Sequence, residues 1–399
     1  MNSLIIIGLA AMAGLFSGHV ANRFKIPVVA GYVIIGVLLG SSVLGVFSNE
    51  ALNEVGLVSS IALSFIAFVI GEELELISLK RLGKSIMLIS IFEALIAFVL
   101  VTAAMQMMQD KLYLSLLLGA VASATAPAAT LMVLRETQAK GVLTTSIMAV
   151  VAIDDAIALI LYSFAASLAK VLMLRSPQAL PWVAIIFNPL KEIVCAIITG
   201  ILCGLALAYI ARKMKSQNDM LILIVGTLLI TTGLARFLHL PELLTNMAMG
   251  VTFCNYAPNL SRRAFSLTAT VTPPLYCMFF VLAGARLQVN LITKVGLLGL
   301  VYTLTRFAGK IGGAKLGAYL GNAPATVQKY LGYALLSQIG VAIGLAIMIA
   351  QEFPPNIYGQ EGQIISTWVI NILLFTTIIT EIIGPIMTRH AVHKAVECK

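Results

Sequence analysis

Long apolar runs, separated by short stretches of charged residues, proline and glycine, make up almost the whole chain. A hydrocarbon core about 30 Å thick needs roughly 20 helical residues, at a rise of about 1.5 Å each, and most of the runs reach that length. They cover residues 3–22, 27–47, 56–75, 85–107, 112–135, 143–172, 186–211, 219–237, 241–257, 265–285, 291–320, 327–351 and 363–387. The pattern predicts an all-α polytopic membrane protein with about 13 transmembrane helices.

Composition agrees with that class. Of the 399 residues 60% are hydrophobic and 11% are charged, and the mean hydropathy is +0.99. Soluble domains carry about 25% charged residues. The net charge of +9 therefore indicates basic loops beside membrane lipid, not nucleic-acid binding. The five cysteines form no close pair and have no histidine partner, so they support neither a metal site nor a disulfide framework. We expect no cofactor, only transported ions.

The basic residues indicate the orientation of the helices. With the N-terminus outside, sixteen arginines and lysines fall in cytoplasmic loops and the C-terminal tail, against six in or beside external loops. Cytoplasmic loops are enriched in basic residues, so the bias predicts an external N-terminus and a cytoplasmic C-terminus. The first apolar run has no basic segment before it and no small-residue cleavage site, so we expect a retained helix of a multi-pass inner (plasma) membrane protein.

An internal repeat divides the chain. Six pairs of identical residues share one gap-free offset of 213 positions: Arg23/Arg236, Phe24/Phe237, Gly71/Gly284, Leu74/Leu287, Leu118/Leu331 and Gly119/Gly332. We expect two inverted six-helix repeats, at 1–175 (helices 1–6) and 216–388 (helices 8–13). Connector helix 7 lies at 176–215 and a cytoplasmic tail at 389–399. Inverted repeats are a transporter architecture, with the binding site near the midplane.

Two adjacent carboxylates, Asp154 and Asp155, interrupt the apolar run at 143–172. Asp154 lies roughly 16 Å along the helix, which is near the bilayer midplane. Ionised carboxylates are costly at that depth and neighbouring ones repel each other, so a chain that keeps both is expected to use them. The pair predicts a site that binds a cation and takes up and releases protons.

Two apolar segments are broken by polar residues. In the fifth, Pro127 removes a backbone donor, and a break there frees carbonyls near Ser123 and Thr125, while a simple kink is the alternative. By the repeat its partner is the twelfth segment, which Ser337 and Gln338 interrupt. We expect helices 5 and 12 to be broken crossing helices. Their lining residues are Ser123, Thr125, Ala126, Pro127, Ser337 and Gln338.

Other charged residues also lie inside apolar segments. Lys310 is the deepest of three cations in the eleventh segment and needs a carboxylate partner, which the aspartate pair can supply. The alternative, a lysine that reaches the membrane surface, fits Lys315 better, and Arg306 is intermediate. Glu381 is near the cytoplasmic end and is expected to reach the headgroups. Glu93 has no assignable partner, and we hypothesise a dimer or domain interface for it.

The pair in IDDAIALI, the broken ATAP segment, the GKIGG lysine segment and the SQIGVAIGLA segment together resemble the monovalent cation/proton antiporters. Within that superfamily the chain is most similar to the bacterial branch with an Asp-Asp pair, the electrogenic sodium/proton exchangers. The resemblance extends from NRFKIP at 22–27 to TEIIGP at 380–385.

The resemblance implies roles for single residues. Asp155 is expected to bind Na⁺ and to carry the proton, and Asp154 to pair with Lys310. Thr125 and its broken backbone are expected to line the cation site. Glu73 resembles a glutamate of the cytoplasmic funnel, with a carboxylate at a loop edge as the alternative. The family also implies a homodimer.

One position departs from the pattern. Related antiporters often carry Arg and Glu where this chain has Gln338 and Ile339, which leaves ion preference and pH sensing open.

The predicted function is secondary-active exchange of Na⁺ (or Li⁺) for H⁺. The carboxylate holds either a cation or a proton, and one helix bundle moves against the other to give alternating access. A K⁺/H⁺ antiporter of the same family remains an alternative, as does a sodium-coupled symporter of an organic anion. A channel is disfavoured because few polar residues lie near the midplane. An enzyme is disfavoured because no His/Cys/Asp cluster is present.

Overall fold

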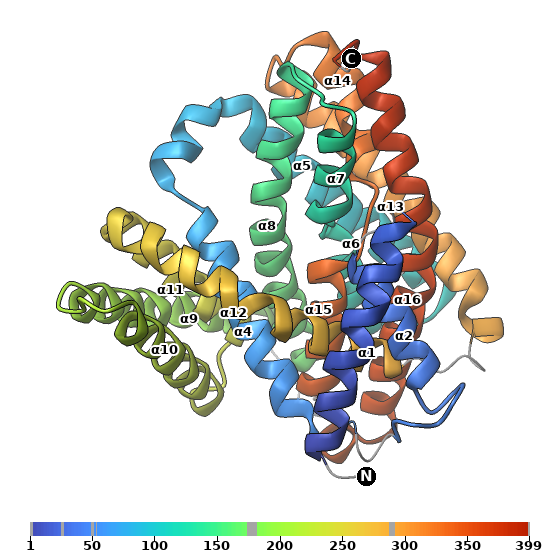
Figure 1. The fold of residues 1–399 in the computed structure, drawn as a ribbon. Coiled ribbons are helices and arrows are strands. Elements are labelled where there is room, and N and C mark those ends of the chain that lie inside the picture. Colours follow the sequence, from blue (N-terminus) through green and yellow to red (C-terminus); the bar gives the residue numbers. More distant parts are fainter. Residues whose placement is uncertain are drawn as a thin grey trace. The chain divides into compact units, whose positions relative to one another are not determined.

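The computed structural model describes residues 3–24, 28–48, 52, 54–173, 182–286 and 292–397. Within these ranges the regular elements are helices, apart from an isolated bridge between Gly40 and Phe47 (Figure 1). The predicted all-α fold is therefore confirmed. Seven of the described helices are long and apolar enough to cross a membrane, or up to eight if one bent pair counts as a single span. The total of about 13 spans stays a prediction.

The chain forms two compact units, each assembled from separate stretches of sequence. Unit 1 contains Met1–Gly56, Leu82–Tyr162 and Cys277–Lys399, and unit 2 contains Leu57–Arg81 and Ser163–Tyr276. Each unit thus draws on both halves of the chain. The two predicted repeats, which are contiguous in sequence, remain a proposal.

The chain passes from one unit to the other within long helices. These include α5 (Leu76–Met108), α8 (Val142–Met173) and α12 (Pro258–Ala285). In α5 the helix is kinked at Gly83, whose φ of 81° lies in the left-handed region that glycine tolerates. In α12 the adjacent prolines Pro273 and Pro274 interrupt the helical hydrogen bonds. Both interruptions lie within a few residues of the change of unit.

Unit 2 is a packed group of helices around an apolar core. Besides parts of α5, α8 and α12 it contains α4 (Gly56–Glu73), α9 (Trp182–Ala211), α10 (Gln217–Phe237) and α11 (Glu242–Tyr256). The rings of Phe68 and Phe253 stack with centroids 6.3 Å apart. Gly71 and Gly250 face the backbone of the opposite helix so closely that a side chain would collide with it. Helices α4 and α11 therefore cross in direct backbone contact.

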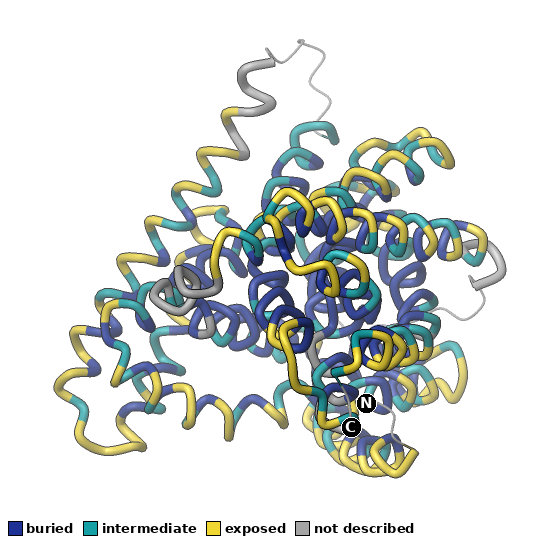
Figure 2. Tube along the Cα trace, turned by 90° about the horizontal axis from the view of Figure 1, so that it is seen from above, coloured by how far each residue is buried: buried dark blue, intermediate teal, exposed yellow. Residues whose placement is uncertain are grey.

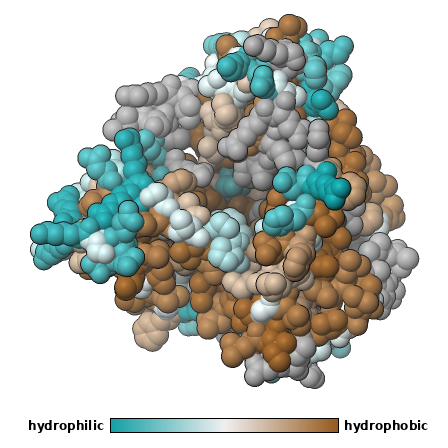
Figure 3. Space-filling model, in the orientation of Figure 1, coloured by the Kyte–Doolittle hydropathy of each residue, from teal (hydrophilic) through white to brown (hydrophobic). Residues whose placement is uncertain are grey.

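Unit 1 contains the remaining helices and both breaks. These helices are α1 (Ser3–Arg23), α2 (Val28–Leu39), α6 (Leu112–Ser123), α7 (Pro127–Glu136), α13 (Ile292–Leu320), α14 (Ala325–Tyr330), the 3₁₀ helix η2 (Leu331–Leu335), α15 (Gly340–Glu352) and α16 (Pro355–Lys394). Exposed apolar residues such as Leu4 and Phe16 cover α1, and the lower part of the face drawn in Figure 3, where α1 and α2 lie, is largely brown. Such a surface suits contact with lipid.

Helix α8 differs from α1 in its burial. In the most apolar 18-residue stretch of each helix, 67% of the residues of α8 are buried, against 28% of those of α1. Figure 2 colours the trace by burial and shows some helices that are mostly buried and others that are mostly exposed. The helix that carries Asp154 and Asp155 is therefore mostly interior to the fold.

The two predicted helix breaks are confirmed. Helix α6 ends at Ser123, Ala124 is extended (φ −70°, ψ 142°), and α7 begins at Pro127. A proline suits the first position of a helix, because its missing N–H has no helical partner there. The second break separates η2 from α15, and the two arms are bent by 47°.

A seam of glycines joins α13 to α5. A Cβ atom on any of four glycines would lie 2.5–2.7 Å from a Cα atom of α5, as seen for Gly309 with Ala97, Gly313 with Glu93, Gly317 with Ile89 and Gly321 with Ser85. Each step of four residues from Gly309 to Gly321, which directly follows α13, matches a step of four in the opposite direction along α5. The two backbones therefore touch over about three helical turns.

The C-terminal tail caps α8. The Glu397 carboxylate accepts hydrogen bonds of 2.8 Å from the backbone N–H groups of Leu143 and Thr144, and one of 2.9 Å from the Thr144 hydroxyl. The Lys140 N–H donates to the Glu397 carbonyl at 2.8 Å. A carboxylate suits the positive end of a helix dipole, so the tail fixes the start of the helix that carries the aspartates.

Candidate functional site

The two breaks lie against each other in unit 1. The Ala126 N–H donates to the Ser337 carbonyl at 2.9 Å, and the Gln338 amide donates to the Val121 carbonyl at 2.9 Å. The Thr125 hydroxyl lies 3.5 Å from the Leu335 carbonyl. The structure thus brings together Thr125, Ala126, Ser337 and Gln338, which the sequence placed in two distant segments.

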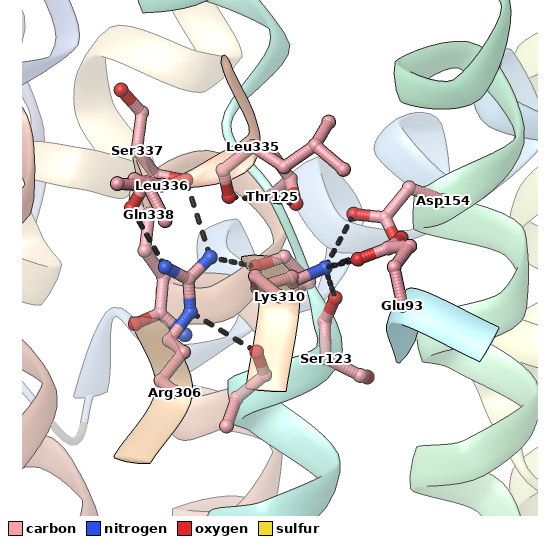
Figure 4. A network of polar contacts seen from close by, with 12 residues as sticks. Glu93, Ser123, Thr125, Asp154, Arg306, Lys310, Leu335, Leu336, Ser337 and Gln338 are labelled. Atoms are coloured by element: carbon pink, nitrogen blue, oxygen red, sulfur yellow. Dashed lines mark hydrogen bonds and ion pairs between the residues drawn. The ribbon is translucent and has the colours of Figure 1, made fainter. Parts of the chain in front are cut away.

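Arg306 of α13 fills the space between the breaks. Its guanidinium donates to four backbone carbonyls: Ala122 at 3.0 Å, Ala124 at 2.8 Å, Leu336 at 2.7 Å and Ser337 at 3.3 Å (Figure 4). Carbonyls at a helix C-terminus have no helical partner and carry partial negative charge. A fully buried arginine therefore satisfies the backbone groups that the breaks release.

Lys310 lies one turn further along α13 and forms ion pairs with two carboxylates. Its Nζ is 3.2 Å from Oδ2 of Asp154 and 2.6 Å from Oε2 of Glu93, and it also donates to the Ser123 carbonyl (Figure 4). All three charged side chains are fully buried. The expected pairing of Lys310 with Asp154 is present in the structure, whereas surface snorkelling is excluded.

The two aspartates of α8 differ in burial. Asp154 is 0% exposed and Asp155 is 8% exposed. Consecutive residues of an α-helix point about 100° apart around its axis, so the two carboxylates face different neighbours. Only Asp154 of this pair forms an ion pair with Lys310 among the described residues.

Glu93 is the residue that the sequence reasoning missed. The hypothesis of a dimer or domain interface is wrong, because Glu93 is fully buried inside unit 1 and is the nearer ion-pair partner of Lys310. The physical cause is the glycine seam, which brings the α5 backbone at Glu93 against Gly313. The signal in the sequence was the spacing of glycines on either side of Lys310.

Glu381 and Lys315 lie in contrasting positions. Glu381 is 8% exposed, so the expectation that it reaches the headgroups is wrong. Its helix α16 packs against α13, α15 and η2. Lys315 is exposed, in agreement with the expectation.

Two predicted site residues lie outside the described side chains. These are Glu73, whose backbone belongs to α4, and Pro127, whose backbone belongs to α7. The site that the structure presents consists of two helix breaks, two buried cations and several buried carboxylates, all within unit 1. That combination is typical of an ion-coupled membrane transporter.

Comparison with known proteins shows the family. The family described as sodium/hydrogen exchanger, transmembrane, matches residues 7–394. The chain is 23% identical to a Na⁺/H⁺ antiporter of Enterococcus hirae over 99% of both chains. It is 25% identical to the ammonium/H⁺ antiporter subunit AmhT of Alkalihalophilus pseudofirmus, over 61% of this chain and 60% of that one.

A solved structure shares the fold. The sodium proton antiporter MjNhaP1 of Methanocaldococcus jannaschii superposes with a TM-score of 0.79 over 98% of both chains, at 18% identity. Together with the family match, this establishes a transporter rather than an enzyme. The chain belongs to the sodium/hydrogen exchanger family, in agreement with the resemblance that its motifs indicated.

Proposed function

We propose that the protein exchanges Na⁺ (or Li⁺) for H⁺ by alternating access, and that Asp155 holds the cation and the proton in turn. The observation that carries the proposal is the pairing of Lys310. Lys310 forms ion pairs with Asp154 and Glu93, whereas Asp155, the next residue along α8, is the more exposed of the two aspartates and faces a different side of the helix. A carboxylate can accept a cation or a proton, and competition between the two couples their movements.

The broken helices complete the proposed site. Unwound backbone in transporters supplies carbonyl ligands for monovalent cations. Here Thr125 and Ala126 lie beside Ser337 and Gln338, and Arg306 holds the released carbonyls in place. Ser123 and Pro127 border the first break. In this proposal the charge of Asp154 neutralises that of Lys310, and the Asp154 carboxylate reorients when the cation binds.

K⁺/H⁺ exchange at the same site is the second candidate. The side chain of Gln338 is neutral and is engaged by the Val121 carbonyl and the Tyr302 hydroxyl, at 2.9 Å each. A charged residue at that place in related antiporters would alter the field at the site. In addition, the similar protein AmhT is an ammonium/H⁺ antiporter subunit, and ammonium is larger than Na⁺.

Three further features belong to the proposal. The protein is placed in the inner (plasma) membrane with its N-terminus outside and its C-terminus in the cytoplasm, on the strength of the basic loops. Glu73 is assigned to a cytoplasmic funnel. The functional form is a homodimer, for which crosslinking of the protein in its native membrane is the direct test.

The function is tested with the purified protein in proteoliposomes that contain a pH-sensitive dye. Addition of Na⁺, Li⁺, K⁺ or NH₄⁺ to vesicles with an imposed pH gradient reports proton movement for each cation. We expect Na⁺ and Li⁺ to release the gradient at the lowest concentrations. A response to K⁺ alone would favour the second candidate, and no response to any cation would reject exchange.

Asp155→Asn tests the assigned carrier in the same assay. Asparagine keeps the size and one carbonyl oxygen but carries no charge and does not titrate. Since removing a buried charge also removes the cost of burying it, the variant is expected to assemble normally. We expect no cation-dependent proton movement at any pH, whereas Asp155→Glu retains part of the activity. Exchange near the wild-type rate by Asp155→Asn would place the carrier elsewhere.

A further inference from the structure

The C-terminal tail turns back at the end of α16 and contacts the start of α8. The Glu397 N–H donates to the Val392 carbonyl at 3.2 Å, and the Val396 N–H donates to the His393 carbonyl at 3.1 Å, which is the pattern of a Schellman motif. Val396 has a φ of 59°, in the left-handed region that a β-branched residue seldom adopts. Such a conformation persists only where the surrounding contacts hold it. The tail therefore has a fixed course, and that course leads Glu397 to α8.

Glu397 contacts α8 with its side chain and its backbone together. Its carboxylate accepts hydrogen bonds from the N–H groups of Leu143 and Thr144 and from the Thr144 hydroxyl, and its carbonyl accepts one from the Lys140 N–H, all at 2.8–2.9 Å. A Cβ atom at Gly141 would collide with the Glu397 carboxyl group, so the missing side chain leaves the space that this group fills. The contact is thus a specific attachment of the tail to the start of the helix.

The attachment joins the aspartate helix to the helices around the two breaks. Helix α16, from which the tail extends, packs against α6, α7, α13, η2 and α15. Helix α8 begins at Val142, reaches Asp154 about 18 Å further along, and leaves unit 1 after Tyr162. The described contacts that hold α8 within unit 1 include Glu397 at its start and the ion pair of Asp154 with Lys310 in its middle.

Helix α8 continues from unit 1 into unit 2, and its attachment matters for this reason. Alternating access, as proposed above, moves one helix bundle against the other. Since a helix is a rigid element that transmits movement along its axis, the part of α8 in unit 2 pulls on the part in unit 1. An attachment at the start of α8 opposes that pull and keeps Asp154 opposite Lys310.

We propose, on the basis of the function proposed above, that Glu397 is a positioning residue for the exchange reaction. The tail anchors the start of α8, so that Asp154 and Asp155 move together with unit 1. The anchor acts while the bundles move, whereas the site at rest keeps the Lys310–Asp154 ion pair without it. Loss of the anchor therefore lowers the maximum rate of exchange and leaves the Na⁺ concentration for half-maximal rate nearly unchanged.

Two substitutions remove the anchor from opposite sides. Glu397→Gln loses the charge and one acceptor oxygen, and Gly141→Ala places a methyl group where the carboxyl group lies. A capping side chain shifts the equilibrium of a helix start by about fivefold. We expect each variant to lower the maximum rate of Na⁺-dependent proton movement in proteoliposomes about fivefold, with half-saturating Na⁺ within about twofold of wild type. The double variant should be no slower than either single one, because both remove the same contact.

Lys394→Gln is the matched control, because Lys394 is an exposed charge beside the same tail. It should exchange at the wild-type rate. Wild-type rates for Glu397→Gln and Gly141→Ala would overturn the inference, and so would effects that multiply in the double variant. Equal slowing by Lys394→Gln and Glu397→Gln would show that the charge of the tail matters instead of the anchor.

A disulfide separates the anchor from its charge. A Cβ atom at Gly141 would lie 2.5 Å from Cγ of Glu397, the atom that a cysteine sulfur replaces, so a disulfide can join these positions. We expect the Gly141→Cys/Glu397→Cys variant, in a background where serine replaces the five native cysteines, to be about fivefold slower than that background when reduced. After oxidation its rate should return to that of the background. Reduced and oxidised vesicles hold the same protein, so the amount of folded protein cannot explain a difference.

The outcomes of the disulfide experiment are distinct. Labelling of free thiols shows whether the crosslink has formed. A crosslinked variant that stays as slow as the reduced one overturns the inference. If the variant does not fold or does not crosslink, the comparison of Glu397→Gln with Gly141→Ala decides. Absence of Na⁺-dependent proton movement in the wild type, by contrast, rejects the proposed function itself and the inference with it.

Discussion

The buried ammonium of Lys310 forms ion pairs with two buried carboxylates in unit 1. Lys310→Gln removes the ammonium that forms ion pairs with both Asp154 and Glu93. Loss of one partner of a buried ion pair costs on the order of 3–5 kcal/mol. We expect a clearly lower Tm for this variant in detergent, measured by intrinsic fluorescence. Lys315→Gln, which changes an exposed lysine of the same helix, should leave Tm nearly unchanged.

Recovery of stability identifies the partners of Lys310. If both carboxylates depend on the lysine, Asp154→Asn in the Lys310→Gln background recovers part of the lost Tm, and Glu93→Gln added to it recovers most of the rest. Replacement of buried charges by neutral groups is often neutral or stabilising once no charge is left alone. A triple variant as unstable as Lys310→Gln would show that the cluster is not held by these ion pairs.

Single residues show what the sequence could and could not predict. Asp154 and Lys310 were paired correctly because each is a charge in an apolar segment, and burial of either one requires the other. Glu93 is also a charged residue in an apolar segment, but from the sequence Asp154, Asp155 and Glu93 could each have paired with Lys310. Only the packing of α5 on α13 decides the choice. Arg306 has carbonyls as partners, and these depend on where the helices break.

At the scale of elements, the glycine seam between α13 and α5 makes a stability prediction. A methyl group at Gly313 would lie 2.6 Å from the Glu93 Cα atom and 2.5 Å from the Phe92 carbonyl oxygen, so Gly313→Ala must push the helices apart. Overpacking of this kind typically costs about 1–3 kcal/mol. We expect a lower Tm and slower exchange, because the Lys310–Glu93 contact lengthens.

The adjacent glycine is the control for that variant. Gly312 lies on the same helix, and a methyl group added there would have no other side chain or neighbouring helix within 4 Å, so Gly312→Ala adds no contact and gains helix propensity. Its Tm should equal or exceed that of the wild type. Equal Tm values for the two alanine variants would show that α13 and α5 are not in backbone contact.

The elements themselves were the most predictable part of the fold. In the described part of the chain the apolar runs form helices, the fifth and twelfth of them broken, because chain that crosses a membrane must satisfy its backbone hydrogen bonds internally. The break at Pro127 was visible because proline cannot donate a hydrogen bond. The kink at Gly83 and the cap of α8 by Glu397 were not visible. They depend on a local backbone angle and on a contact between distant residues.

At the scale of the whole molecule, the inverted repeat can be tested with one pair of equivalent positions. Phe24 and Phe237 are related by the 213-residue offset, each lies at or just beyond a helix end, and they are 71% and 81% exposed. If helix 7 is a single connector, it places the two repeats in opposite orientations. The basic loops then put Phe24 on the cytoplasmic side and Phe237 on the external side.

The measurement is labelling of Phe24→Cys and Phe237→Cys in intact cells, in a background where serine replaces the five native cysteines. A membrane-impermeant maleimide should label Phe237→Cys directly, and Phe24→Cys only after permeabilisation. Parallel repeats would expose both cysteines on the same side, so equal labelling in intact cells contradicts the inverted arrangement. Labelling of Phe24→Cys alone would keep the inversion and reverse the orientation, which would also place the basic loops outside, against their usual distribution.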